Sequence, residues 1–203
     1  MVAMAGLVVG AVQPYGINEF LALGNQLAEE PVYMALVVFG MILLFTFGLP
    51  GSLGLWLIAP FQPPLIATTL LLAGSLGGAL GAYLFSARFR EDALPEGFAG
   101  RVLALLSRHS GLLNQIVLRI LPAFPHSVVN FCAGILGLPL LRFLAAAIIG
   151  LAVKWSVYAT ALYEMVEVVE EDRAIGLSAG ASLLILGLLL LVGAWARRRV
   201  DAT

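Results

Sequence analysis

The chain of 203 residues is 61% hydrophobic and only 11% charged, whereas soluble domains carry about 25% charged residues. This composition predicts a polytopic membrane protein and leaves little chain for a soluble domain. Eleven basic and twelve acidic side chains give a net charge of -1, so there is no bulk basic face for nucleic acid. The single cysteine, Cys132, excludes an internal disulfide and metal sites built on paired cysteines.

Residues 1–30 are expected to form an N-terminal interfacial segment. The first twelve residues are apolar, but they lack a basic region and a convincing cleavage site, so we interpret them as retained. Residues 15–30 place apolar and acidic side chains at helical spacing, which predicts a short helix at the membrane surface. Pro31 suits a helix start, and residues 31–47 form the first predicted crossing, although they fall short of the usual 20 or so.

Glycine and proline residues interrupt the apolar run between residues 48 and 64. This stretch never becomes polar, unlike a water-exposed loop. We therefore predict a first re-entrant hairpin over about 48–64, with Pro50 and Gly51 among its structural residues. The second predicted crossing, 65–87, follows.

The second crossing carries glycines that form overlapping small-xxx-small pairs, which let another backbone approach closely. They are Gly74, Gly77, Gly78 and Gly81. Helix packing is the favoured interpretation, and a substrate path is the alternative. A charged loop over 88–114 then contains an expected amphipathic helix at 99–114, with Arg101, Arg108 and His109 on its polar side.

Residues 115–138 contain an arginine and two prolines that a bilayer should reject. Arg119 would cost about 2.5 to 3.5 kcal/mol at mid-bilayer, and Pro122 and Pro125 each remove a backbone donor. Such a segment is tolerated where protein or a watery cavity covers the freed backbone groups. We predict a second re-entrant hairpin here, held broken by the two prolines, in which Gly134 allows a tight turn or close packing.

Two further crossings, 139–163 and 175–196, complete the predicted layout. Residues 164–203 hold an acidic loop, the last crossing and an arginine-rich tail. With four crossings, the positive-inside rule is satisfied if both termini and the loop 88–114 are cytoplasmic. The re-entrant segments then enter from opposite faces, which is typical of inverted-repeat transporters with a site near the midplane.

Apart from Arg142 near the start of the third crossing, the predicted membrane region holds three basic side chains and no carboxylate. Arg119 either snorkels or caps backbone carbonyls, or its counter-ion is an anionic ligand such as a lipid phosphate. His126 is a candidate proton relay but is more often a hydrogen-bonded structural group. Asn130 can satisfy backbone groups across the hairpin. Lys154 is expected to snorkel or bond a carbonyl more readily than to contact a substrate.

Enzymatic, metal and cofactor chemistry is not expected. Ser127 adjoins His126, but adjacent residues do not make a nucleophile and base pair, and no embedded acid could orient the histidine. Two histidines and one cysteine match no metal-ligand spacing. The sequence has no glycine-rich loop for phosphate.

The segment 119–150, RILPAFPHSVVNFCAGILGLPLLRFLAAAIIG, resembles the DedA and VTT-domain superfamily, also called SNARE-associated Golgi proteins. The matching positions are Arg119, Pro122, Pro125, Asn130, Gly134, Pro139, Phe143 and Gly150. Weaker support comes from Gly48, Pro50, Gly51, Gly77, Gly81, Tyr83, Ala87 and Arg88. The resemblance covers about residues 40–163, within an expected membrane core of 31–163.

The resemblance implies an all-α membrane protein with two oppositely facing re-entrant hairpins that moves phospholipids or polyprenyl phosphates between leaflets. Two departures stand out. The first hairpin lacks the acidic residue typical of DedA flippases, and Pro125 stands where a second arginine is usual. Both departures weigh against proton-driven flipping of a doubly charged carrier, and they leave passive scrambling or uptake of a small solute open.

We expect a flippase- or scramblase-like lipid transporter in a bacterial plasma membrane, with no enzymatic activity and no cofactor. The residues expected to contact a lipid head group are Arg119, His126 and Asn130. Its expected partners are phosphate-containing membrane lipids, with homo-oligomerisation left open. The alternatives are a carrier or channel for a small solute or ion, and an assembly scaffold that uses the glycines of residues 74–81 as a partner surface.

Overall fold

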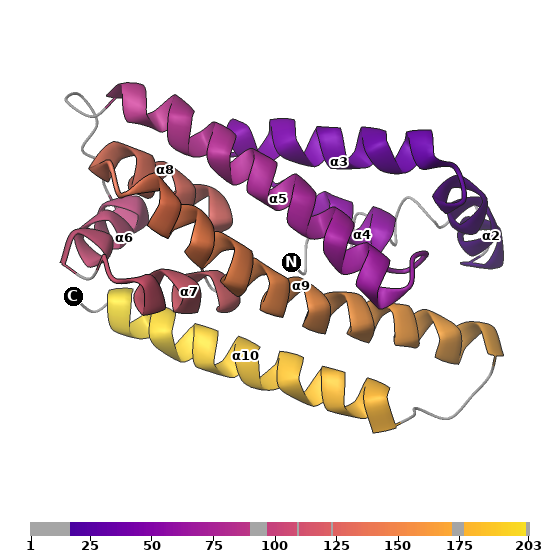
Figure 1. Cartoon of the computed structure of the whole chain (residues 1–203). Coiled ribbons are helices and arrows are strands. Elements are labelled where there is room, and N and C mark those ends of the chain that lie inside the picture. Colours follow the sequence, from indigo (N-terminus) through magenta and orange to yellow (C-terminus); the bar gives the residue numbers. More distant parts are fainter. Residues whose placement is uncertain (1–16, 90–96, 109, 123, 172–176, 202–203) are drawn as a thin grey trace.

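The computed structural model describes residues 17–89, 97–108, 110–122, 124–171 and 177–201, and this part of the chain is a helical bundle without strands (Figure 1). Its α-helices are α2 (Ile17–Ala28), α3 (Pro31–Thr46), α4 (Leu53–Ile58), α5 (Pro64–Ser86), α6 (Gly97–Arg108), α7 (Leu112–Ile120), α8 (His126–Leu136), α9 (Leu140–Glu171) and α10 (Leu177–Asp201). A short 3-10 helix, η1 (Ala87–Phe89), extends α5. The predicted all-α fold is confirmed.

Three of the described helices are long and apolar enough to cross a membrane. They cover Pro64–Phe89, Leu140–Val168 and Gly180–Arg198, and they match three predicted crossings. The first predicted crossing corresponds to α3, which qualifies only together with α2, from which it is bent by 91°. At 16 residues, α3 is about 24 Å long, which is shorter than a hydrocarbon core of about 30 Å.

Helices α3 and α4 are the two arms of a first hairpin, named here hairpin 1 (residues 31–58). The chain turns at Gly48, whose φ of 77° lies in the left-handed region that favours glycine. Beyond the turn, a Cβ at Gly51 would lie 2.6 Å from Cδ2 of Phe45, so the returning arm packs tightly on the first. Gln62 then donates a 2.7 Å hydrogen bond to the carbonyl of Ala28, which brings the chain back to the end at which α3 began.

This arrangement extends the predicted first re-entrant segment. The range 48–64 holds only the turn and the returning arm, because the incoming arm is α3 itself. Hydropathy cannot distinguish a membrane crossing from one arm of a re-entrant hairpin, since an arm packed against α5 is as apolar as a crossing. The two arms, α3 and α4, start and finish at the same end of the bundle.

The glycine-rich face of α5 packs against α3. A Cβ at Gly77 would lie 2.8 Å from Cγ1 of Ile42, and one at Gly78 would lie 3.2 Å from the carbonyl oxygen of Ile42. Gly74 and Gly81 meet Met41 and Thr46 of α3. The four glycines thus allow close contact between two helices of the same chain, and that contact occupies the surface considered for a partner.

Helices α7 and α8 form a second hairpin, named here hairpin 2 (residues 112–136), which enters from the opposite end of the bundle (Figure 1). Its arms meet at the stretch that holds Pro122 and Pro125, and Pro125 is the N-cap of α8. Gly134 lies against Ser86 and the carbonyl of Tyr83, so this glycine serves close packing of α8 on α5. The turn at the end of α8 is made by Gly137, with a φ of 61°.

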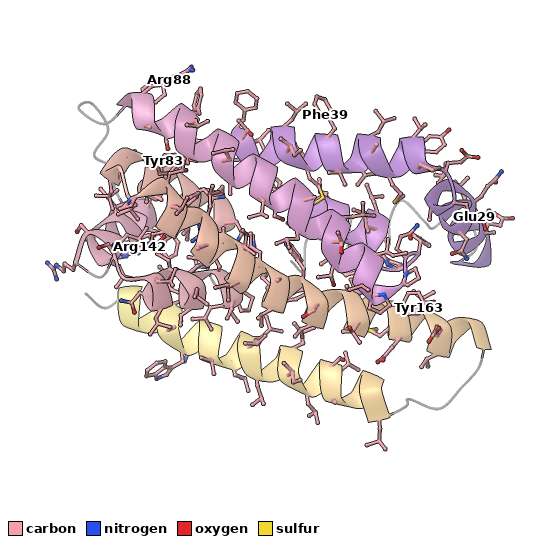
Figure 2. The ribbon with its side chains drawn as sticks, viewed as in Figure 1. Glu29, Phe39, Tyr83, Arg88, Arg142 and Tyr163 are labelled. Atoms are coloured by element: carbon pink, nitrogen blue, oxygen red, sulfur yellow. The ribbon has the colours of Figure 1, made fainter. Side chains whose placement is uncertain are left out.

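The two ends of the bundle differ in charge. Figure 2 shows Arg88 and Arg142 at one end and Glu29 at the other. The end with Arg88 and Arg142 is named here the basic end. It also holds α6 and the C-terminal part of α10 (Figure 1), which carry Arg101, Arg108, Arg197 and Arg198. Helix α2 lies at the opposite, acidic end.

Two sequence-based boundaries differ from the structure. The predicted acidic loop begins inside α9, which continues to Glu171, so Glu164 and Glu167 are helical. The predicted amphipathic helix at 99–114 is α6, which ends at Arg108, and α7 starts at Leu112. His109 and residues 1–16 lie outside the described residues, so the cytoplasmic position of the N-terminus stays a prediction. The four-crossing layout puts residues 15–30 on the same side as the loop 88–114, but α2 lies at the acidic end, opposite to α6 (Figure 1). The difference arises because α3 and α4 form a hairpin that returns the chain to the end where α3 began.

Candidate functional site

A cavity of about 340 Å³ lies where the tips of the two hairpins meet α9 and α10. Its volume falls within the range of about 300–1,000 Å³ typical of small-molecule sites. Hairpin 1 contributes residues around its turn, and hairpin 2 contributes its proline-rich break. The lining includes Gly48, Leu49, Pro50, Ser52, Pro122, Pro125, His126, Ser127, Lys154, Trp155, Tyr158, Leu183 and Leu186. We call it the hairpin cavity.

The same residues that interrupt the helices build the cavity walls. Pro50 and Pro125 line the cavity, and each lies where proline interrupts an apolar run that could otherwise continue as a helix. The N-terminus of α8 opens on the cavity, because Pro125, His126 and Ser127 all line it. The first N–H groups of any α-helix lack an intrahelical acceptor, and in α8 the N-cap residue Pro125 supplies no side chain to take its place.

A lysine and a histidine form the polar centre of the hairpin cavity. The Nζ atom of Lys154 lies 3.0 Å from Nε2 of His126, although the two residues are 28 positions apart. An ammonium group can only donate hydrogen bonds, so Nε2 is the acceptor and the proton of the neutral imidazole lies on Nδ1. Lys154 is only 7% exposed. The pair therefore places one positive charge in an otherwise apolar wall.

Aromatic rings hold this pair in place. The ring of His126 lies 5.8 Å from that of Trp155 and 6.1 Å from that of Phe45. Lys154 Nζ lies 5.6 Å from the ring centroids of both Trp155 and Tyr158, within the range of cation–π attraction. Nε1 of Trp155 donates a 3.0 Å hydrogen bond to Oγ of Ser75. The cation therefore lies close to two aromatic rings, of which that of Trp155 is hydrogen-bonded to α5.

Arg119 lies inside hairpin 2 and does not line the hairpin cavity. It is 1% exposed and donates to Oδ1 of Asn130 at 3.3 Å and to the carbonyl of Gln115 at 3.5 Å. Its Cζ atom is 4.6 Å from the ring centroid of Phe143. The arginine thus bonds a side chain and a carbonyl of its own hairpin and stacks on α9.

The structure divides the expected head-group residues into two sets. His126 lines the hairpin cavity, whereas Arg119 and Asn130 bond each other within the hairpin. Of the expected hairpin residues, Pro50, Pro122 and Pro125 line the cavity. Gly51 and Gly134 lie at close packing contacts.

Lys154 is the cavity residue that the sequence reasoning passed over. Its expected behaviour was to snorkel or bond a carbonyl, but the structure gives it an imidazole partner inside the bundle. The available signal is a lysine fourteen residues beyond Leu140, where the long apolar helix α9 starts. Its partner His126 is in hairpin 2, 28 positions earlier, so spacing along the chain could not reveal the contact.

The long apolar helices and the two opposed hairpins define an integral membrane protein built on re-entrant segments. A family model of the VTT domain matches residues 30–164, well over half of the chain. The chain therefore belongs to the VTT-domain family, that of the DedA and SNARE-associated Golgi proteins. The match covers both hairpins and most of α9 but not α10. Neither the curated proteins nor the solved structures give a match.

Proposed function

We propose that this protein moves phosphate-bearing lipids between the two leaflets of a membrane, as a flippase- or scramblase-like transporter. The hairpin cavity carries the proposal, because it places a buried cation between two hairpins that enter from opposite ends. A site reached from both sides through broken helices is the arrangement expected for alternating access. Membership of the DedA family supports the same conclusion.

In this proposal the basic end faces the cytoplasm of a bacterial plasma membrane. Arg88 and Arg142 lie at that end (Figure 2), and lysine and arginine are enriched on the cytoplasmic side of membrane helices. Hairpin 2 then enters from the cytoplasm and hairpin 1 from outside. A head group could approach the cavity from either leaflet past one hairpin tip.

Helix α10 gives the proposed lipid a side wall. Leu183 and Leu186 line the cavity, while Leu184, Leu188 and Leu191 on the same helix are 61–71% exposed. A helix with one face on the cavity and the other exposed is suited to let acyl chains stay in the bilayer while the head group enters. This division favours a lipid over a fully soluble substrate.

A bulky side chain in the cavity tests the proposal. We expect Ser127→Trp to abolish transfer of a fluorescent phospholipid in proteoliposomes, because the indole would fill space between the hairpin tips. Leu141→Trp is the matched control, since Leu141 is 86% exposed and does not line the cavity. Equal transfer by the wild type and Ser127→Trp would contradict the proposal.

The second candidate function is a carrier for a small anionic solute. The cavity volume of about 340 Å³ and its single cation favour this candidate over a cation channel. Solute flux and lipid transfer should therefore be measured on the same reconstituted sample. Gradient-dependent flux without lipid transfer would establish the second candidate. The scaffold alternative loses the glycine surface on which it relied, because the glycines of α5 face α3.

A further inference from the structure

We infer that Lys154, together with the N-terminus of α8, binds the phosphate oxyanion of the ligand, and that Arg119 positions hairpin 2 without touching the ligand. This inference rests on the proposed function and names the residue that selects anionic lipids. The two buried cations have different surroundings, and α8 starts at the cavity that Lys154 lines.

Lys154 holds a positive charge that the described part of the chain does not neutralise. Its one hydrogen bond there is to Nε2 of His126, and no carboxylate of the described residues lies within ion-pair distance of it. Two of its three N–H donors thus have no protein acceptor among these residues. A buried charge without a partner is costly, and buried ionisable groups in membrane segments mark ligand paths. An entering anion would supply the missing charge.

The α8 N-terminus supplies further donors beside the lysine. His126 and Ser127 are the first two residues of α8, which has 11 residues, and both line the cavity. The free N–H groups of a first helical turn and the helix dipole attract an anion. The Ser127 hydroxyl adds another donor. An oxyanion against Lys154 Nζ therefore meets donors from two helices.

Arg119 has the opposite surroundings. Its guanidinium bonds Asn130 of α8 and the carbonyl of Gln115 in α7, and it stacks on Phe143 of α9. The carbonyl of Ile116 would lie 2.9 Å from a Cβ at Gly150, so α7 and α9 are in close contact beside it. Arg119 therefore links three helices. Its loss should shift hairpin 2 and slow every substrate alike.

The remaining lining predicts the chemistry of the rest of the ligand. Trp155, Tyr158 and the leucines of α10 offer an apolar wall, which suits a glycerol backbone or acyl chain. The cationic centre repels a quaternary ammonium, so a zwitterionic choline head group should enter less readily. A soluble phosphate ester carries the same oxyanion as a lipid head group, so its uptake must be measured separately.

The experiment compares two fluorescent lipids with identical acyl chains, phosphatidylglycerol and phosphatidylcholine, in proteoliposomes. We expect the wild type to transfer phosphatidylglycerol faster, because both lipids carry the phosphate but only phosphatidylcholine carries a second, positive charge that Lys154 repels. Lys154→Gln should lower this preference at least about tenfold, since placing like charges together in a site disfavours the wrong partner by more than that factor. Lys154→Arg should keep the preference because it keeps the charge. Arg142→Gln is the matched control, since it removes an exposed charge from the same helix.

Variants of Arg119 show whether this residue positions hairpin 2 or contacts the ligand. Arg119→Gln should slow both lipids by the same factor and leave the ratio of the two rates unchanged, and Arg119→Lys should recover part of the rate. A preference that survives Lys154→Gln in folded protein would overturn the inference, as would a preference lost in Arg119→Gln.

The same experiment distinguishes a failure of the lipid-transport proposal from a failure of the proposed role of Lys154. If the wild type transfers neither lipid, the lipid-transport proposal fails. Uptake of soluble glycerol phosphate that depends on Lys154, without lipid transfer, would support the anion contact and assign it to the second candidate function. Lipid transfer without any head-group preference would leave lipid transport standing and refute the role of Lys154.

Discussion

Arg119 illustrates how a cation can be buried in a membrane domain without a carboxylate. Its donors are spread over an amide oxygen and a helix carbonyl, and its flat face lies on Phe143. Guanidinium suits such a place because it is more weakly hydrated than ammonium and stacks on aromatic rings. The sequence showed that the acid was missing but could not show that Asn130 takes part of its place.

Asn130 gives a prediction at this scale. Replacing Asn130 with Ala leaves a guanidinium N–H of Arg119 without its partner, which should lower the free energy of unfolding by about 1–3 kcal/mol. Thermal or denaturant unfolding of the detergent-solubilised protein measures the loss. Gln26→Ala, at an exposed site on α2, should change it by less than about 0.5 kcal/mol. An unchanged midpoint for Asn130→Ala would mean that the 3.3 Å contact contributes nothing.

Among the residues of the cavity, sequence reasoning identified His126 but assigned Lys154 another role. The proline break marked His126, because proline in an apolar run is a local signal. Lys154 depends on a contact between α8 and α9, which no pattern within either helix contains. Local chemistry was therefore predictable, and the pairing was not.

Helix α5 shows at the element scale why its glycines occur where they do. Hairpin 1 lies against α5 along α3, and a side chain at Gly78 would meet the carbonyl oxygen of Ile42 and the side chain of Phe45. Backbone atoms cannot give way as a flexible side chain can. The close approach of α3 therefore depends on this position.

Gly78→Leu tests that dependence. We expect it to lower stability by about 1–3 kcal/mol or more, which is the usual range for overpacking a tight contact, and to reduce lipid transfer because hairpin 1 carries one cavity wall. Gly40→Leu is the control, since a Cβ at Gly40 would meet nothing within 4 Å. Thermal midpoints and transfer rates of both variants provide the comparison. Equal effects at the two glycines would argue against a specific helix contact.

The hairpins themselves were predictable as interrupted apolar segments, and their full extent was not. Proline and glycine marked both turns because these residues disturb helices wherever they occur. The sequence predicts α3, the first arm of hairpin 1, as a crossing. Its length falls between that of a full crossing and that of a short re-entrant arm. Only its contacts with α4 and α5 decide that it is one arm of a pair.

The charge of the two ends leads to a prediction for the whole molecule. Arg142 lies at the basic end and Glu29 at the acidic end (Figure 2), so cysteines at these sites should react with a membrane-impermeant thiol reagent from opposite sides. In a Cys132→Ala background, Glu29→Cys should label in intact cells and Arg142→Cys only after the membrane is opened. Labelling of both positions from the same side would contradict the proposed orientation.

The side wall of the hairpin cavity comes from outside the region that matches the VTT domain. Leu183 and Leu186 belong to α10, whereas the match ends at residue 164. The cation of the site and its side wall therefore belong to separate parts of the chain. If the site binds a lipid phosphate as proposed, a relative with the same hairpins but another final helix should bind the same head group with a differently shaped tail.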